Sequence, residues 1–355
     1  MTNKFLILGA SYGSLFATKL AMAKHDVTLC CRSDEADLIN KDGTLVRVPL
    51  SDGSQAEISS LSLPGRISAS TPEAVSLENV DIVVLAMQEP QYAAAEIREL
   101  LEKIALNRLP CISLMNMPPL TFLRRIPNVK ADGLRDCYSD ASVWDVFDPA
   151  LFTLCSPDPQ AYRPADEGLN VLQVTLPTNF KVAAFGNALY DALLHEIQSD
   201  IEAVRYETDE GSKAVPVKMK VHESVFVPMA KWAMLLTGNY RCIQRDGMRS
   251  IAEAVHANLE DSRSVYEWVQ SVCIELGAAS ADLVPFSKYA KAAEGLRSPS
   301  SAARALFSGA RQIERVDMLV QRIGARLGHH HPLVEQSVRL VDERLTLNRR
   351  EHSKV

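Results

Sequence analysis

A lysine in the second half of the chain is the residue best placed for acid catalysis. Lys231 lies in the segment "PMAKWAMLLTGN" among methionine, tryptophan and leucine side chains. Partial burial among such groups would lower the pKa of its ammonium group, which suits a general acid near neutral pH. Asn239 follows eight residues later, on the same face of a helix. A lysine in such a helix can equally extend its charged end to the surface, so both interpretations stay open.

A glycine-containing turn near the N-terminus could bind a phosphate group. The segment "LGASYGS" follows the apolar run "KFLI" and opens a helical pattern. Gly9 could serve the tight turn and Gly13 the close packing of helix on strand, although Ser11 stands where G-x-G-x-x-G has a glycine. Backbone N–H groups at the helix start, with the Ser14 hydroxyl, could still bind an anion, and a plain strand-to-helix turn is the alternative. The expected cofactor-binding residues are Gly9, Ala10, Ser11, Tyr12, Gly13 and Ser14.

The end of the next strand-like run, "DVTLCCR", indicates which cofactor this turn would hold. Dinucleotide-binding folds that prefer NAD usually place Asp or Glu there, to bind the ribose hydroxyls. This chain has Arg32, whose guanidinium group can pair with a 2′-phosphate. We therefore expect NADPH or NADP as the cofactor, with an ordinary surface arginine as the alternative.

The elements that must position these residues alternate between strand and helix in the N-terminal part. Strand-like runs cover 4–9, 26–32, 80–87 and 111–116, and helical patterns cover 13–24 and 91–104. This alternation predicts an α/β fold with an N-terminal, doubly wound parallel sheet of the Rossmann type. Such a sheet binds its ligand at the carboxyl ends of the strands.

The rest of the chain divides into a loose segment and a helical one. Segment 117–215 is rich in proline, yet 171–176 and 181–186 look like strands and 187–201 like an amphipathic helix. Residues 207–220 have the composition of a linker, and helical patterns follow. We predict a dinucleotide-binding domain over 1–215, with an extended segment from about 117, and an all-α C-terminal domain over 216–355.

Composition excludes several classes of protein. The 355 residues carry a net charge of −6, which argues against nucleic acid as a partner, and no apolar run is long enough to span a membrane. Seven cysteines without a C-x-x-C pair, and an N-terminus without a signal-peptide pattern, predict a cytoplasmic protein with reduced thiols. Three consecutive histidines in "GHHHP" cannot all face one metal ion, so no metal is expected.

Several segments together resemble one enzyme family. "LGASYGSLFATKLAMAKHDVTLCCR" is similar to the opening of the ketopantoate reductases, within the 6-phosphogluconate-dehydrogenase-like group of two-domain reductases. "ISLMNMPP", "AKWAMLLTGN" and "SPSSAARALFSGARQIERVDMLVQRIGARLGHHHP" resemble later segments of that family. The resemblance implies that Lys231 is the catalytic lysine, that Asn116 faces cofactor and substrate, and that Asn239 and Ser300 bind the substrate. A homodimer is also expected.

The chain departs from the family at three positions. A lysine that assists the cofactor in the family is replaced by Gln88, the first asparagine after the catalytic lysine by Leu235, and a substrate-contacting glutamate by Gln312. Because these replacements remove charge and hydrogen-bonding capacity from the pocket, they argue against ketopantoate itself as the substrate. We still expect Gln88 to contact the cofactor and Gln312 to contact the substrate.

These observations lead to three functional hypotheses. The first is an NADPH-dependent reductase of a small 2-oxo acid or related carbonyl compound, in which Lys231 donates a proton and Asn116 orients the lysine or the nicotinamide. The second keeps the fold and reduces an imine, as opine-type dehydrogenases do. The third is a non-catalytic sensor of NADPH or NADP, suggested by Gln88, Leu235 and Gln312.

Overall fold

The computed structural model describes residues 2–208 and 211–352, and the chain folds into two compact units. Unit 1 comprises Met1–Met87, Gln91–Phe122 and Ser142–Val225, and unit 2 comprises Gln88–Pro90, Leu123–Ala141 and Phe226–Val355. The sequence predicts a division at residues 215 and 216. In the structure 216–225 instead pack with unit 1, and part of the proline-rich segment packs with unit 2.

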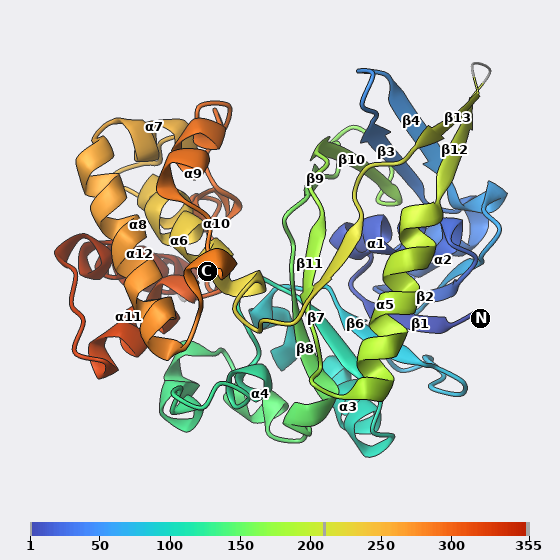
Figure 1. Cartoon of the computed structure of the whole chain (residues 1–355), viewed down its shortest axis with the longest axis horizontal. Helices are drawn as coiled ribbons and strands as arrows, with labels where there is room; N and C mark the ends of the chain where they lie inside the picture. Colours follow the sequence, from blue (N-terminus) through green and yellow to red (C-terminus); the bar gives the residue numbers. More distant parts are fainter. Residues whose placement is uncertain (1, 209–210, 353–355) are drawn as a thin grey trace. The chain divides into compact units, whose positions relative to one another are not determined.

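An eight-stranded sheet forms the centre of unit 1 (Figure 1). Its strands are β1 (Lys4–Leu8), β2 (Asp26–Cys30), β5 (Ile67–Ser70), β6 (Ile82–Leu85), β7 (Cys111–Leu114), β8 (Phe152–Ser156), β11 (Phe180–Ala183) and β14 (Met219–His222). They lie in the order β14-β11-β8-β7-β6-β1-β2-β5, and the pairs from β5 to β8 are parallel, whereas β11 is antiparallel to β8. The predicted Rossmann-type sheet is confirmed.

The order in which successive strands are added to this sheet changes direction between β1 and β6. The chain first runs outward from β1 through β2 to β5, and then returns to pair β6 with the other edge of β1. Two neighbouring parallel strands whose following segments leave in opposite directions form a crevice at their carboxyl ends, where such sheets bind ligands. The residues that follow β1 and β6 are therefore the first place to look for a cofactor site.

A second sheet, which the sequence does not predict as a sheet, covers the first helix of unit 1. It consists of β4 (Gln55–Ser59), β3 (Leu45–Pro49), β10 (Val171–Leu176) and β9 (Gln160–Tyr162), in that order. Helix α1 (Ala10–Met22) contacts strands of both sheets and also α5 (Ala188–Ala203). Because it is enclosed in this way, α1 buries every residue from 13 to 21.

The enclosure of α1 also buries a lysine. The Lys19 side chain is 1% exposed, and its ammonium group donates hydrogen bonds to the carbonyl oxygens of Pro216 at 3.1 Å and Val215 at 3.4 Å. Burial, followed by the nearby positive charge of Lys218, lowers the pKa of Lys19 to about 7. This lysine therefore ties α1 to the segment that leads into β14.

We expect Lys19→Met to flatten the pH dependence of unit 1 stability. In the unfolded chain Lys19 keeps its proton up to about pH 10.5, whereas in the folded chain it loses the proton near pH 7. The unfolded state then binds more protons across this interval, so the Lys19 contribution makes the free energy of unfolding rise with pH. Denaturant titrations at several pH values should show a smaller rise for Lys19→Met, and no change for the exposed Lys41→Met. Equal slopes for wild type and Lys19→Met would contradict the lowered pKa.

The segment predicted to be a linker is instead part of unit 1. Strands β12 (Arg205–Thr208) and β13 (Gly211–Ala214) form an antiparallel pair, and β14 then joins the main sheet beside β11. Residues 209–210 lie outside the described part. The charged composition of 207–220 is misleading because Val215, Val217 and Met219 alternate along the chain and are all buried.

Unit 2 is helical, as predicted for the C-terminal region. Its helices are α7 (Ile251–His256), α8 (Leu259–Leu276), α9 (Phe286–Ala293), α10 (Ser301–Phe307), α11 (Val316–Arg326) and α12 (Pro332–His352), preceded by the short helical segment that carries Lys231. Asn258 caps α8 through hydrogen bonds from Glu260 and Asp261, and Gly277 ends it with a φ of 118°. Across residues 2–208 and 211–352, no helix has both the length and the apolar character needed to span a membrane.

Candidate functional site

Gly9 makes the tight turn that the sequence predicts at the end of β1. Its φ of 104° favours glycine, and its N–H donates to the carbonyl oxygen of Cys30 at 2.9 Å. A Cβ atom at this position would lie 2.7 Å from Cγ of Met87 and 2.9 Å from the carbonyl oxygen of Ala86, which both follow β6. Any larger side chain would therefore collide with the residues that follow β6, at the point where the path of the chain across the sheet reverses.

Gly13 plays the packing role expected of it. A Cβ atom on Gly13 would approach Cγ2 of Ile7 to 2.8 Å, so only glycine allows α1 to lie this close to β1. The close approach fixes the first turn of α1 directly beyond the carboxyl end of β1. In a dinucleotide-binding fold this is the position that the pyrophosphate occupies.

The first turn of α1 presents unpaired backbone groups to a ligand. The first N–H groups of any α-helix lack acceptors within the helix, and no side chain in the described residues caps α1. Its first turn contains no acidic residue, and Ser11 is exposed there. The positive end of the helix dipole and these N–H groups together favour an anion. The residues present therefore fit the pyrophosphate of a nicotinamide dinucleotide.

Two side chains of this turn have partners inside the protein. The Tyr12 hydroxyl donates to the carbonyl oxygen of Pro159 at 2.6 Å, and the buried Ser14 hydroxyl donates to the carbonyl oxygen of Ala10 within α1. The expected help of the Ser14 hydroxyl in anion binding would require this bond to break. Backbone N–H groups are thus better placed than side chains to bind the pyrophosphate.

Arg32 lies just beyond β2, directly before α2 (Ser33–Asp42). Its side chain is 70% exposed, and Nε lies 3.5 Å from Oδ1 of Asp34. The other acidic residue in this turn, Glu35, is buried and pairs with Arg163. Both carboxylates that could bind ribose hydroxyls therefore already face an arginine, and the Arg32 guanidinium stays accessible.

Asn116 carries a buried acceptor that has no partner. It lies two residues beyond β7 and is half-buried, and its Oδ1 atom accepts no hydrogen bond from the described residues. An unsatisfied buried polar atom typically costs about 1 to 3 kcal/mol, so it points to a donor supplied by a ligand. The amide N–H of a nicotinamide carboxamide group is such a donor. Asn116 therefore fits the predicted contact with the cofactor.

The helical segment that carries Lys231 is not the uniform helix that the sequence predicts. An α-helical turn over Lys231–Met234 is followed by a π-helical turn over Leu235–Asn239. The Tyr289 hydroxyl donates to the carbonyl oxygen of Met234 at 3.1 Å, at the start of the π-helical turn. A Cβ atom on Gly238 would lie 2.1 Å from that hydroxyl, so the glycine makes room for it. The inserted hydroxyl explains why the hydrogen-bond ladder widens here.

The π turn changes how Lys231 and Asn239 are related. The sequence predicts that both residues share one face of a helix, but in a uniform α-helix eight residues make about 2.2 turns and rotate Asn239 by about 80° from Lys231. A π turn contains more residues, and it rotates Asn239 back toward the face of Lys231. Both residues are half-buried, whereas Leu235, Leu236, Thr237 and Gly238 between them are buried. Widened turns of this kind are frequent at functional sites.

Ser300 supports this helix end. Its hydroxyl donates to the carbonyl oxygen of Asn239 at 2.7 Å and accepts the N–H of Ala303 at 3.2 Å, which caps α10. The residue is 2% exposed. In this structure Ser300 therefore holds the backbone of Asn239, and its predicted contact with substrate stays a prediction.

The N-terminal region matches a known family. Residues 5–116 match the family model of ketopantoate reductase PanE/ApbA, over a range that contains the Gly9 turn, Arg32 and Asn116. The match supports the resemblance to the ketopantoate reductases over this region of the chain. The family resemblance of the sequence is thus confirmed, although a comparison with curated proteins finds no match.

Solved structures share the fold over nearly the whole chain. D-mandelate dehydrogenase with NADH and anilino(oxo)acetate has a TM-score of 0.65 at 13% identity, covering 98% of this chain and 99% of that one. The 2-dehydropantoate 2-reductase of Methylococcus capsulatus has a TM-score of 0.67 at 11% identity, with coverage of 98% and 97%. A PanE/ApbA family ketopantoate reductase of Ralstonia eutropha JMP134 has a TM-score of 0.61 at 18% identity, with coverage of 98% and 99%. The chain therefore has the fold of the ketopantoate reductases.

Two carboxylates, Glu314 and Glu89, lie beside the positions where this chain departs from the family, and the sequence does not single out Glu89. Gln88 and Gln312 are both exposed. Glu314 accepts the N–H of Glu89 at 3.3 Å, and the buried Glu89 carboxylate accepts the N–H of Ser139 at 3.0 Å. Burial raises the pKa of Glu89 to about 7. In the sequence, the signal that could have pointed to Glu89 was its position next to Gln88, just after an apolar strand.

The three consecutive histidines have separate partners. His329 lies 2.5 Å from Glu275, His330 lies 3.4 Å from Glu335, and His331 bonds the Ser264 hydroxyl at 2.8 Å. Among the residues that the structure describes, no group of three or more histidine, cysteine or acidic side chains could hold a metal ion. The three side chains thus serve local contacts around α8 and α12.

Proposed function

We propose that this protein is an NADPH-dependent reductase of a small 2-oxo acid or a related carbonyl compound. The observation that carries the proposal is the cradle at the switch point of the main sheet, where Gly9 has no room for a Cβ atom and the first turn of α1 has neither a side-chain cap nor an acidic residue. The family match of residues 5–116 supports the same assignment.

Different residues have separate roles in the proposed chemistry. The backbone from Gly9 to Gly13 binds the pyrophosphate, Arg32 the 2′-phosphate, and Asn116 the nicotinamide amide. A cofactor held there would supply a hydride to the carbonyl carbon of the substrate. Lys231 would donate a proton from Nζ to the carbonyl oxygen, so that the C=O group becomes CH–OH.

The substrate class rests on a structural neighbour and on Lys231 and Asn239. D-mandelate dehydrogenase was solved with anilino(oxo)acetate, a derivative of a 2-oxo acid. Here Asn239 holds the carboxylate or another polar end of the substrate, with Ser300 fixing its backbone. Gln88 and Gln312 are kept as weaker contacts, because both side chains are exposed.

Two further properties belong to the proposal. A homodimer is proposed because one structural neighbour is a dimeric ketopantoate reductase of Staphylococcus aureus. A cytoplasmic location is proposed because all seven cysteines are free and six of them are buried.

The cofactor preference gives the direct test of the Arg32 assignment. We expect wild type to bind NADPH more tightly than NADH, and Arg32→Ala to lose roughly ten- to a hundredfold in NADPH affinity, because a charge-assisted bond to the phosphate disappears. NADH affinity should stay unchanged, and so should folding, because the side chain is largely exposed. Titration of tryptophan fluorescence with both cofactors measures this. Equal wild-type affinities for the two cofactors, or tighter binding of NADH, would reject the NADPH preference.

A further inference from the structure

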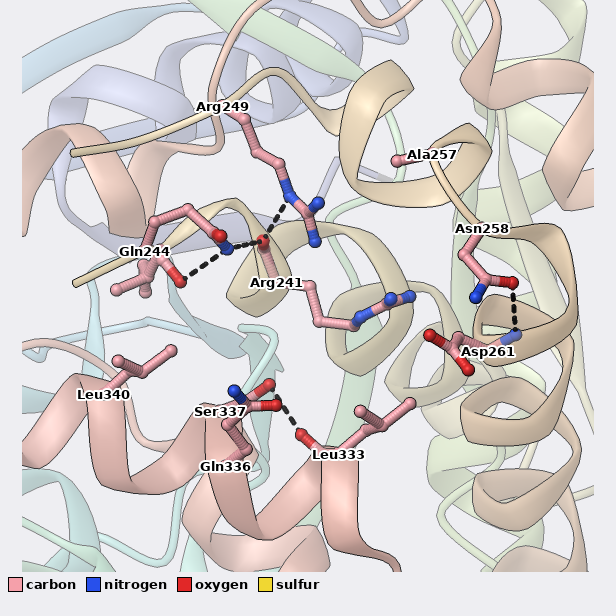
Figure 2. A pocket seen from close by; sticks show the side chains of 11 residues that line it. Arg241, Gln244, Arg249, Ala257, Asn258, Asp261, Leu333, Gln336, Ser337 and Leu340 are labelled. Atoms are coloured by element: carbon pink, nitrogen blue, oxygen red, sulfur yellow. Dashed lines mark hydrogen bonds between the residues drawn. The ribbon is translucent and has the colours of Figure 1, made fainter. Parts of the chain in front are cut away.

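Unit 2 contains a cavity of about 230 Å³ that the proposed reaction does not use. It lies between the segment 241–249, the start of α8 and α12, and Figure 2 shows the side chains around it. Arg241, Arg249 and Asp261 bring charge to its wall, Gln336 brings an amide, and Leu333 and Leu340 bring apolar surface. The cavity therefore combines cationic and apolar walls in a small volume.

Both arginines are held in place without a carboxylate partner. The Arg241 Nη1 atom donates to the Ser262 hydroxyl at 2.7 Å, and Ser262 in turn donates to the carbonyl oxygen of Val255 at 2.7 Å. Arg249 donates from Nε to the carbonyl oxygen of Arg241 at 3.0 Å, as Figure 2 shows. Within the described ranges neither arginine forms an ion pair. These bonds orient the guanidinium groups and leave their charges uncompensated by direct contact.

The lining of the cavity carries a positive net charge. Two arginines and one aspartate line it, which gives a net charge of +1, while Glu253, outside the lining, interacts electrostatically with Arg249. Burial, and then the positive charge of Arg249, lowers the pKa of Arg241, and the charge of Asp261 opposes this only in part. A negatively charged ligand between the two guanidinium groups would relieve their mutual repulsion.

We propose that this cavity binds a small organic anion, whose carboxylate pairs with Arg249 and Arg241 and whose short hydrocarbon part lies against Leu333 and Leu340. Guanidinium groups match the planar geometry of a carboxylate through paired N–H donors. Pockets for drug-sized ligands typically measure about 300 to 1,000 Å³, so this cavity suits a smaller molecule. The site is independent of the cofactor cradle, which unit 1 provides.

Calorimetric titration of the full chain with 3-methylbutanoate tests the proposal, at constant ionic strength and with inorganic phosphate as a second probe. We expect wild type to bind 3-methylbutanoate more tightly than phosphate, because only the carboxylate carries a hydrocarbon group. Arg249→Ala should weaken binding by about tenfold or more, the scale of one charge-assisted bond. Gln336→Glu should weaken it as well, since it adds a negative charge to the wall without changing side-chain volume.

The matched control is Arg245→Ala. Arg245 is exposed in the same segment and does not line the cavity, so its removal changes the net charge equally and should leave binding unchanged. If Arg249→Ala does not fold, the exposed Gln336→Glu variant decides the question. The proposal is overturned if wild type binds neither probe or binds phosphate more tightly than 3-methylbutanoate. It is also overturned if Arg249→Ala, or Gln336→Glu where Arg249→Ala does not fold, binds 3-methylbutanoate as wild type does.

Discussion

Replacing Lys231 with alanine is expected to lower turnover by roughly 10²- to 10⁴-fold, the usual scale for loss of a positioned general acid. The affinity for NADPH should barely change, because the residues proposed to bind the cofactor lie on other elements. Steady-state rates at saturating NADPH measure the first effect and fluorescence titration measures the second. A loss in both would point to general damage instead of a role in proton transfer.

Lys288→Ala is the matched control for this experiment. Lys288 lies on α9 of unit 2, is exposed, and has the same side chain. Its removal should leave both turnover and NADPH affinity at wild-type values. If Lys231→Ala turned over substrate at the wild-type rate, the proton-donor assignment would be wrong, and the hypothesis of a non-catalytic sensor would gain support.

Ser11→Asp is expected to weaken NADPH and NADH binding by about a hundredfold or more. The new carboxylate would stand in the first turn of α1, and placing like charges together typically costs several kcal/mol. A negative charge at a helix N-terminus normally stabilises the helix, so the variant should be at least as stable as wild type. Fluorescence titration and thermal unfolding on the same sample measure both effects.

Ser11→Asn separates charge from side-chain shape in this test. It has nearly the same volume as Ser11→Asp without the charge, and Ser11 is exposed, so its cofactor affinity should stay close to that of wild type. Gly13 is less suitable for such a test, because a Cβ atom there already approaches Ile7 to 2.8 Å and would disturb the packing of α1. Unchanged NADPH affinity in Ser11→Asp would contradict the location of the pyrophosphate.

The sequence predicts the parts of the fold in which local pattern and burial agree. Strands β1, β6 and β7 are buried at nearly every position, so they read as continuous apolar runs. Strand β3 alternates between buried and half-buried residues, and its partner β4 begins with the exposed Gln55. Such short, half-polar strands resemble loops in sequence, and only their pairing with each other and with β10 shows that they form a sheet.

Only part of the candidate site follows from the residues themselves. Gly9 and Gly13 follow from the demands of a tight turn beside a strand, whereas Asn116 is expected only from the resemblance to the ketopantoate reductases. The π turn was not predictable, because it depends on the Tyr289 hydroxyl, which reaches Met234 from 55 residues away in the chain. The same reason applies to Glu89 and Glu314, whose hydrogen bond joins residues separated by 225 positions.

Oxidation of NADPH by the purified wild-type protein, followed with a panel of 2-oxo acids in the presence and absence of added amines, tests the proposed function most directly. The account predicts that at least one 2-oxo acid is reduced without an amine, with one NADPH oxidised for each hydroxy acid formed. Oxidation that required an amine would assign the protein to imine reduction. Tight NADPH binding without oxidation by any compound of the panel would contradict the proposed reductase and favour a sensor.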